Sequence, residues 1–226
     1  MIYVVTIFPL VLYAFFFHKF IRKYEFIHYG ITGIIALTFG VVEGHNFFNE
    51  GFLGVSFFII VMFTGVLAKG KLKRNLNQVR AQYAIIGFIL ISGHALPYLF
   101  YLLDEGMIFV HLTIIMGILC YVIFVPLFIT SFMIIRRRMT FKQWKALHKF
   151  AYLSYGFIFI HLFLINNSRQ MFYVVLFALY TILKIITVLD KNYTKKKLKQ
   201  NQTKIVSNWQ DWPIYNIYLQ LWLSLI

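Results

Sequence analysis

The chain of 226 residues is too hydrophobic for a soluble domain of its length. Hydrophobic residues make up 61% of it, aromatic residues 20% and charged residues only 13%, so a soluble fold could not cover the apolar surface. The formal net charge of +15 does not indicate a nucleic-acid-binding protein, because the Lys and Arg residues form short clusters between long apolar runs. A lipid bilayer is therefore the expected solvent.

Seven apolar runs are candidate membrane spans, since a spanning helix needs roughly 20 mostly apolar residues. They predict an all-α membrane protein. In chain order the expected spans are residues 2–17, 26–44, 51–69, 82–103, 107–135, 146–166 and 171–189.

Basic and non-basic connections alternate between these spans. Residues 18–24, 69–80, 136–145 and 190–199 are strongly basic, whereas the other three connections carry hardly any Lys or Arg. Because positively charged loops face the cytoplasm, the alternation predicts an external N-terminus and a cytoplasmic C-terminus. The first run has no basic region before it, so we expect an outside-to-inside anchor and not a cleaved signal.

The predicted cytoplasmic parts are small. The connections are too short to form a nucleotide-binding domain, so we expect any flavin or NAD(P)H dehydrogenase to be a separate protein. The end of the chain, residues 208–226, contains three Trp and two Tyr in a stretch too short to span. It fits a segment at the inner interface, and disorder is the alternative.

Two of the seven histidines lie at matched depth within the predicted spans. His94 follows Arg80 by 14 residues and His161 follows Lys145 by 16, which at about 1.5 Å per residue places them about 21 and 24 Å into the membrane. An ionisable side chain at that depth is costly and indicates function. Two neutral imidazoles from two helices suit the axial positions of a six-coordinate heme iron. Interhelical hydrogen bonding is the alternative for each.

The same count places each of the other five histidines near one surface of the membrane. They are His18, His28 and His148 at the inner surface and His45 and His111 at the outer surface.

The single cysteine, Cys120, lies within an apolar run, so this chain alone cannot build a disulfide or a cysteine-ligated cluster.

One segment of the chain resembles a known family. Residues 126–165 carry the pattern PL-x-x-TS, a basic loop, W-x-x-LH-K-x-x-Y and a second His. This pattern resembles the ferric reductase-like transmembrane domain family, most of all the heme-binding membrane subunit of the bacterial periplasmic methionine sulfoxide reductase system. A weaker resemblance covers residues 79–104. The matching residues are Pro126, Leu127, Thr130, Ser131, Trp144, Leu147, His148, Lys149, Tyr152 and His161, and in the weaker segment Arg80, His94, Tyr98 and Asp104.

The resemblance implies a domain organisation. Residues 26–189 would form the six-helix heme-binding bundle of the family. Residues 1–25 would then be an extra transmembrane anchor with its basic loop, and residues 190–226 a basic cytoplasmic tail with the aromatic interfacial segment. In the family, electrons pass from a cytoplasmic flavin reductase or quinol donor to an acceptor on the outer face.

The resemblance also names heme-ligand candidates, at the positions of His94, His148 and His161. Larger members stack two hemes, but the inner partner of His148 would here fall near Arg80, and arginine is not a heme ligand. We therefore expect one heme b, with its iron held by His94 and His161. His148 could replace one of them, bond a propionate, or contact FMN or a quinone. Arg80 could pair with a heme propionate or a flavin phosphate, or simply reach the membrane surface.

The predicted outer face combines carboxylates with an imidazole, which could attract Fe³⁺ as a cationic acceptor. A separate extracytoplasmic acceptor protein is the other expectation. The residues concerned are Glu43, His45, Glu50, Asp104 and Glu105.

Three function classes follow. The first is a transmembrane electron-transfer subunit, an oxidoreductase component that needs partner proteins. The second is a histidine-using metal-ion or proton transporter, although no acidic residue lies at mid-membrane and no broken-helix repeat is visible. The third is a non-catalytic membrane scaffold. The alternating basic loops and Lys-rich composition predict a multi-pass protein of a bacterial cytoplasmic membrane, with no nucleic-acid partner.

Overall fold

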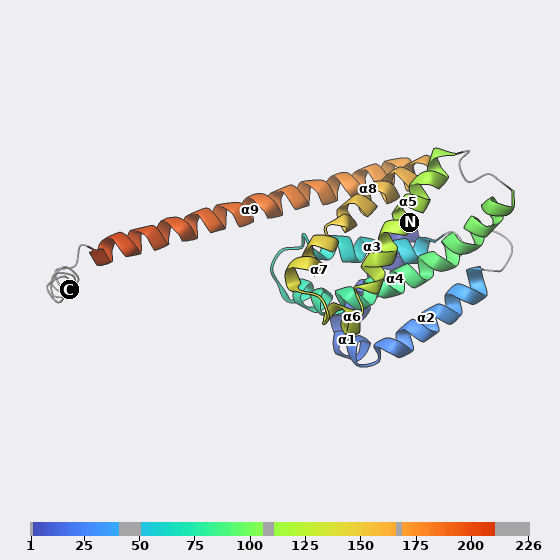
Figure 1. Cartoon of the computed structure of the whole chain (residues 1–226), viewed down its shortest axis with the longest axis horizontal. Helices are drawn as coiled ribbons and strands as arrows, with labels where there is room; N and C mark the ends of the chain where they lie inside the picture. The colour runs from blue at the N-terminus through green and yellow to red at the C-terminus, as the bar shows by residue number, and fades with distance from the viewer. Residues whose placement is uncertain (1, 41–50, 106–110, 166–168, 211–226) are drawn as a thin grey trace. The chain divides into compact units, whose positions relative to one another are not determined.

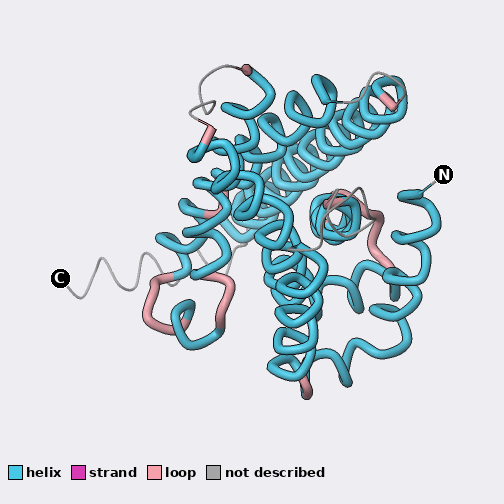
Figure 2. The backbone as a smooth tube through the Cα atoms, turned by 90° about the vertical axis from the view of Figure 1, so that its right-hand side faces the viewer, coloured by secondary structure: helices cyan, strands magenta, loops and turns pink. Residues whose placement is uncertain are grey.

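The computed structural model describes residues 2–40, 51–105, 111–165 and 169–210, and these residues form helices joined by turns, without a strand among them (Figures 1 and 2). The chain divides into two compact units, Met1–Tyr180 and Thr181–Ile226. The helices are α1 (Ile2–Lys23), α2 (Glu25–Gly40), α3 (Phe52–Thr64), α4 (Lys71–Asp104), α5 (Leu112–Ile129), α6 (Met133–Arg136), α7 (Phe141–Leu147), α8 (Phe150–Ile165) and α9 (Gln170–Gln210).

Several helices are long and apolar enough to cross a membrane, which confirms a multi-pass membrane protein. Among the described residues five segments meet this criterion, while α3 is a shorter apolar helix and α2 has 16 residues. The count of seven spans and their orientation stay predictions. The five segments are Val5–Lys23, Lys71–Asp104, Leu112–Ile129, Phe141–Ile165 and Gln170–Gln202.

The helices extend beyond several predicted spans. α1 continues through the basic residues to Lys23, with a kink at Phe17, α4 begins at Lys71 and not near residue 82, and α9 continues through residues 190–199. Lys, Arg, Leu and Gln are all good helix formers. Hydropathy therefore indicates where a helix enters the bilayer, not where its hydrogen bonding starts.

α5 ends earlier than the predicted boundary at residue 135. The hydroxyl of Thr130 donates to the carbonyl of Pro126 at 2.7 Å, and that of Ser131 donates to the carbonyl of Leu127 at 2.7 Å. The last carbonyls of a helix lack backbone donors. The hydroxyl of Ser131 supplies a donor to Leu127, whereas the carbonyl of Pro126 accepts from the backbone N–H of Thr130 at 3.1 Å as well as from its hydroxyl. These bonds satisfy the last turn of α5.

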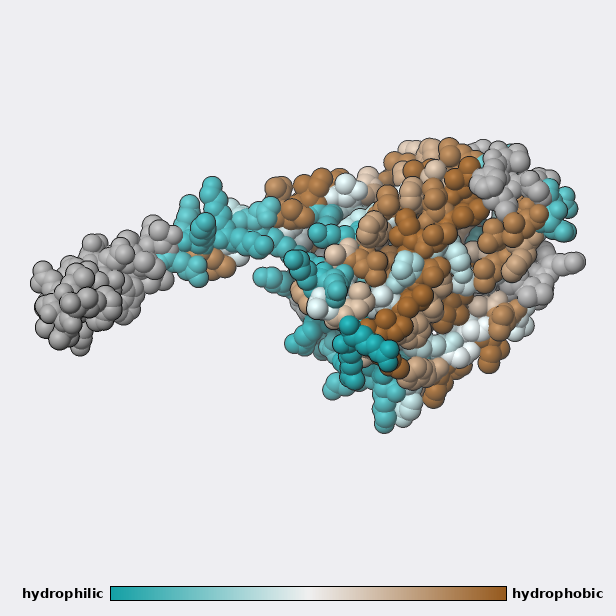
Figure 3. Space-filling model, viewed as in Figure 1, coloured by the Kyte–Doolittle hydropathy of each residue, from teal (hydrophilic) through white to brown (hydrophobic). Residues whose placement is uncertain are grey.

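α4 is the central helix of the unit Met1–Tyr180. It packs against α1, α2, α3 and α5, and α5 packs in turn against α8 (Figure 1). The visible outer surface of these helices is largely hydrophobic (Figure 3), as contact with lipid requires. The buried cluster between α1, α3 and α4 consists of Ala14, Ile21, Phe57, Ile60, Val61, Leu76, Val79, Tyr83, Ile86 and Leu90.

The first helix is part of this packed unit. Hydrogen bonds tie it to α3 and α4, and hydrogen bonds between helices stabilise membrane bundles because lipid offers no competing partner. They join Thr6 to Ser56 (2.7 Å), Tyr83 to the carbonyl of Leu10 (2.6 Å) and Asn75 to the carbonyl of Phe15 (2.9 Å).

Candidate functional site

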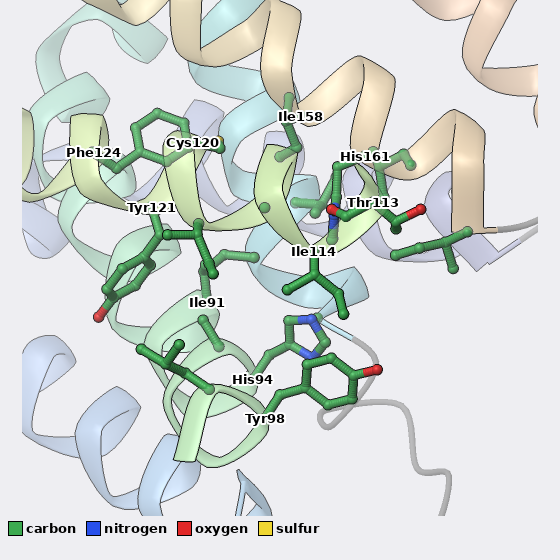
Figure 4. A pocket seen from close by; sticks show the side chains of 18 of the residues that line it. Ile91, His94, Tyr98, Thr113, Ile114, Cys120, Tyr121, Phe124, Ile158 and His161 are labelled. Atoms are coloured by element: carbon green, nitrogen blue, oxygen red, sulfur yellow. The ribbon is translucent and has the colours of Figure 1, made fainter. Parts of the chain in front are cut away.

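A largely apolar cavity of about 740 Å³ lies within the unit Met1–Tyr180, between α3, α4, α5, α8 and the start of α9 (Figure 4). This volume is within the range of about 300–1,000 Å³ that is usual for small-molecule and cofactor sites. His94 of α4 and His161 of α8 both line it. The structure thus brings together the two histidines that the depth count paired.

His161 is held in one tautomer. Its Nδ1 lies 2.8 Å from the backbone carbonyl oxygen of Thr113 in the first turn of α5. A carbonyl oxygen only accepts, so Nδ1 must carry the proton and donate it. The lone pair of Nε2 is then available. A ring N–H donated to a backbone carbonyl is the usual support of a metal-ligating histidine.

Gly117 of α5 makes room for this ring. A Cβ atom at residue 117 would lie 2.8 Å from Cε1 and 2.9 Å from Nδ1 of His161. Contacts this short do not occur between real atoms, so any larger residue would displace the imidazole. A glycine in the facing turn of α5 is therefore a condition for the bond between His161 and Thr113.

His94 faces the cavity from the opposite wall. Gly51 precedes α3 with φ +73°, which only glycine adopts readily, and a Cβ there would lie 3.3 Å from the His94 ring. In Figure 4 the side chain of Ile114 is seen between the two rings.

His148 lies elsewhere, in what we call the His148 cluster: Thr130, Arg136, Trp144 and His148. The His148 ring lies against Trp144 at 4.3 Å between centroids, tilted by 32°, and Cζ of Arg136 lies 4.4 Å from the centre of the Trp144 ring. Neither His148 nor Arg80 lines the cavity. Helix α7 also ends at Leu147 and α8 begins at Phe150. His148 and His161 therefore do not lie on one continuous helix.

The hydrogen bond of His148 also differs from that of His161. Its Nε2 lies 3.2 Å from Oγ1 of Thr130, whose own hydroxyl proton is donated to the carbonyl of Pro126 at 2.7 Å. The oxygen of Thr130 is then an acceptor, so Nε2 of His148 is the donor. In this arrangement His148 has no free lone pair on Nε2.

The remaining described histidines have local partners or are exposed, and none lines the cavity. His28 donates from Nδ1 to the carbonyl of Tyr24 at 2.7 Å and accepts at Nε2 from the hydroxyl of Tyr13 at 2.8 Å. His18 contacts the carbonyl of Phe15 at 3.4 Å.

The expected acidic outer face is described only in part. His111 immediately precedes α5 and is exposed, and Asp104 and Glu105 are exposed at the end of α4. Glu43, His45 and Glu50 lie outside the described residues.

Arg169 is a cavity residue that sequence reasoning did not single out. It lies just before α9, lines the cavity, and is the only Lys or Arg among the described residues that do so. A signal existed, because it is the one basic residue in a connection predicted to be external. Gly117 and the carbonyl of Thr113 gave no comparable signal.

A six-coordinate heme iron needs only two ligands from the protein, because the porphyrin supplies the other four. Within the described ranges no group of three or more His, Cys, Asp or Glu side chains is placed to hold a metal ion. The cavity fits a heme in three respects: two imidazoles from different helices, an apolar lining, and a free Nε2 on His161.

Part of the chain is similar to a known family of membrane proteins. Residues 50–160, just under half of the chain, match the family described as Ferric reductase like transmembrane component. The match includes Arg80, His94 and His148 and ends one residue before His161. The specific likeness to the methionine sulfoxide reductase subunit is not confirmed.

One similar protein is an uncharacterized protein from Treponema pallidum (strain Nichols). It is 28% identical over 214 residues, which cover 77% of this chain. The chain spans 57% of the length of that relative. No solved structure matches significantly. The chain is thus a multi-pass membrane protein whose residues 50–160 are similar to ferric reductase-like transmembrane components, a likeness that suggests a membrane electron-transfer component.

Proposed function

We propose that this protein is a transmembrane electron-transfer subunit that holds a heme b between His94 and His161. The observation that carries the proposal is the pairing of these imidazoles, from α4 and α8, on one apolar cavity. The bond between His161 and the carbonyl of Thr113 adds to it, because it leaves Nε2 free for a metal.

A bound heme would carry one electron at a time, and the cavity suits such a group. Its walls are mainly Ile, Leu, Val and aromatic side chains from the five helices. Such a lining excludes water, and the potential of a heme depends on burial and on the support of its axial ligands. The carbonyl of Thr113 orients the His161 ring, and Gly51 lets α3 approach His94 closely.

The direction of transfer follows from the basic loops. With these in the cytoplasm, the His148 cluster faces the inner surface and the cavity lies in the outer half of the membrane. The donor is then a cytoplasmic flavin reductase or a quinol, and the acceptor an extracytoplasmic protein or ferric ion. The W-x-x-LH-K-x-x-Y run favours a role like that of the methionine sulfoxide reductase heme subunit.

FMN or a quinone is a second cofactor that the His148 cluster could contact. Nε1 of Trp144 is buried and has no hydrogen-bond partner among the described residues, and buried N–H groups normally have one. An acceptor atom of a bound ring would satisfy it.

The test is a dithionite-reduced minus oxidised spectrum of the full chain, purified from membranes in mild detergent with a heme supply. We expect the bands of a low-spin b-type heme at about one heme per chain. A transporter or a scaffold predicts no chromophore. A colourless protein from heme-replete cells would therefore defeat the proposal.

A further inference from the structure

Arg169 carries a buried donor that has no acceptor among the described residues. Its Nη1 atom has no hydrogen-bond partner in that part of the chain, although the guanidinium lies on the wall of the cavity. Nearly all buried polar atoms in proteins are hydrogen-bonded. An unpaired buried donor therefore needs an explanation, and one explanation is that it binds a ligand.

The position of this guanidinium is well defined. Its Cζ lies 4.6 Å from the centre of the Phe52 ring, a cation–π contact that holds the group by its face and leaves its N–H edge free to donate. The carbonyl of Arg169 accepts from the backbone N–H of Tyr173 at 3.2 Å, and the side chain of Gln170 donates to the carbonyl of Phe163 at 2.9 Å. Arg169 is thereby fixed where α9 starts beside the end of α8.

An aromatic group behind Phe52 stabilises this arrangement and includes the first helix. Tyr3 of α1 contacts Phe52 edge to face at 5.5 Å and stacks on Phe172 at 5.3 Å. Its hydroxyl lies 3.1 Å from that of Tyr173, which itself lines the cavity. The helix outside the six-helix bundle thus supports the wall on which Arg169 lies.

The cavity offers no anion of its own to this cation. Among its described lining residues there is no Asp or Glu. A buried cation is costly unless it is paired with a negative charge. Carboxylates are the natural partners, because the planar guanidinium donates two parallel N–H groups to their two oxygens.

We infer that Arg169 binds a carboxylate of the cavity's ligand and, given the heme proposed above, that it anchors a heme propionate at the end of the cavity next to the connection between α8 and α9. The inference rests on the proposed function for the identity of the ligand. Arg80, the arginine that the sequence suggested for this role, does not line the cavity. Arg169 orients the macrocycle, while the two histidines hold its metal.

The test changes both partners of the contact. Full-length protein from heme-deficient cells is titrated with heme and with heme dimethyl ester, in which both carboxylates are neutral, and binding is followed by absorbance. The wild type should bind heme roughly 10- to 100-fold more tightly than the ester, the range expected for hydrogen bonds between charged groups. Arg169→Gln should weaken heme binding by a similar factor, leave ester binding unchanged, and so lose the preference.

Two further variants keep the test decisive. Arg169→Lys retains the charge but not the bidentate geometry, so it should keep part of the preference. Arg138→Gln makes the matched change at an exposed arginine and should behave as the wild type. If Arg169→Gln does not fold, the wild-type comparison of heme with its ester still decides.

The outcomes separate the two proposals. A wild type that binds heme and its ester equally, or an Arg169→Gln protein that keeps the preference, overturns the inference and leaves the heme site intact. A wild type that binds neither compound removes the proposed function, and the inference falls with it.

Discussion

The cavity and the His148 cluster each contain a histidine that contacts α5 or the residue that follows it, but the hydrogen-bond partners of the two histidines differ. His161 donates to the backbone carbonyl of Thr113 near the start of α5, whereas His148 contacts the hydroxyl of Thr130 at its end. The carbonyl can only accept, so it leaves Nε2 of His161 free. The hydroxyl accepts from Nε2 of His148 and occupies it. The hydrogen-bond partner thus decides which ring nitrogen keeps its lone pair in a neutral imidazole: Nε2 in His161 and Nδ1 in His148.

The two regions also differ in their charges and in the space they offer. The cavity has a volume of about 740 Å³ and one permanently charged described side chain, Arg169. In the His148 cluster the tilted rings of Trp144 and His148 are in contact, and the guanidinium of Arg136 lies over Trp144. A large apolar ligand therefore fits the first region, and the second suits a contact at the edge of a cofactor or partner.

The largest expected effect is in membrane topology, because a reporter fused next to each region is either active or inactive on a given side of the membrane. A topology reporter fused after Arg138, close to the His148 cluster, should be cytoplasmic because the loop is strongly basic. A reporter fused near Glu105, at the end of α4 that bears His94, should be external. Alkaline phosphatase activity, with a cytoplasmic fluorescent reporter at the same sites, measures both. A cytoplasmic result at Glu105 would reverse the proposed direction of electron transfer.

The next effect compares the histidines themselves. His94→Ala and His161→Ala should each lose the low-spin spectrum or fail to retain heme, because each removes one axial nitrogen. His148→Ala should keep a low-spin heme, with at most a shifted potential. Optical and EPR spectra of the three purified variants test this. An unchanged low-spin heme in His94→Ala would disprove the ligand pair, and heme loss confined to His148→Ala would move the site to the cluster.

The fold class was predictable because its signals are compositional. Apolar runs of spanning length and alternating basic loops are properties of whole segments, and the helical multi-pass protein that they indicate is confirmed. The pairing of His94 and His161 on one cavity could also be anticipated, since depth depends only on counting residues from the last cation. Their binding of heme stays a prediction.

Other features depended on contacts that one-dimensional patterns do not encode. The carbonyl of Thr113 belongs to the backbone, so the residue type at position 113 does not indicate that it accepts a hydrogen bond from His161. Gly117 matters only because His161 of another helix approaches it. The interruption at His148 lies inside a run that reads as continuous helix. These features depend on the three-dimensional arrangement of the helices and not on local residue patterns.

A smaller effect isolates the support of His161. Gly117→Ala places a Cβ 2.8 Å from Cε1 of His161, so the ring should shift and its bond to Thr113 should break. Loss of such a supporting bond typically costs about 10- to 100-fold in metal affinity, and we expect heme affinity to fall by a factor in this range. Heme titration of the apoprotein measures it.

Gly156→Ala is the matched control for this change. Residue 156 lies on α8 itself, and an added Cβ there meets nothing within 4 Å. Its heme affinity should equal that of the wild type, and helix propensity should slightly favour the alanine. Equal heme affinities in the Gly117→Ala and Gly156→Ala proteins would show that the close approach of α5 does not position His161.

The smallest expected effect lies in the His148 cluster. Thr130→Val removes the hydroxyl that contacts Nε2 of His148, and Thr32→Val is its control. Both threonines are 8% exposed and donate to the carbonyl four residues earlier, but only Thr130 also contacts the ring of a histidine. Hydrogen bonds within membrane bundles contribute on average about 0.6 kcal/mol. Thermal unfolding should therefore occur at a slightly lower temperature in Thr130→Val than in Thr32→Val, while the heme spectrum of both stays that of the wild type. A changed low-spin spectrum in Thr130→Val alone would show that His148 communicates with the iron, and the two regions would then have to be treated as one site.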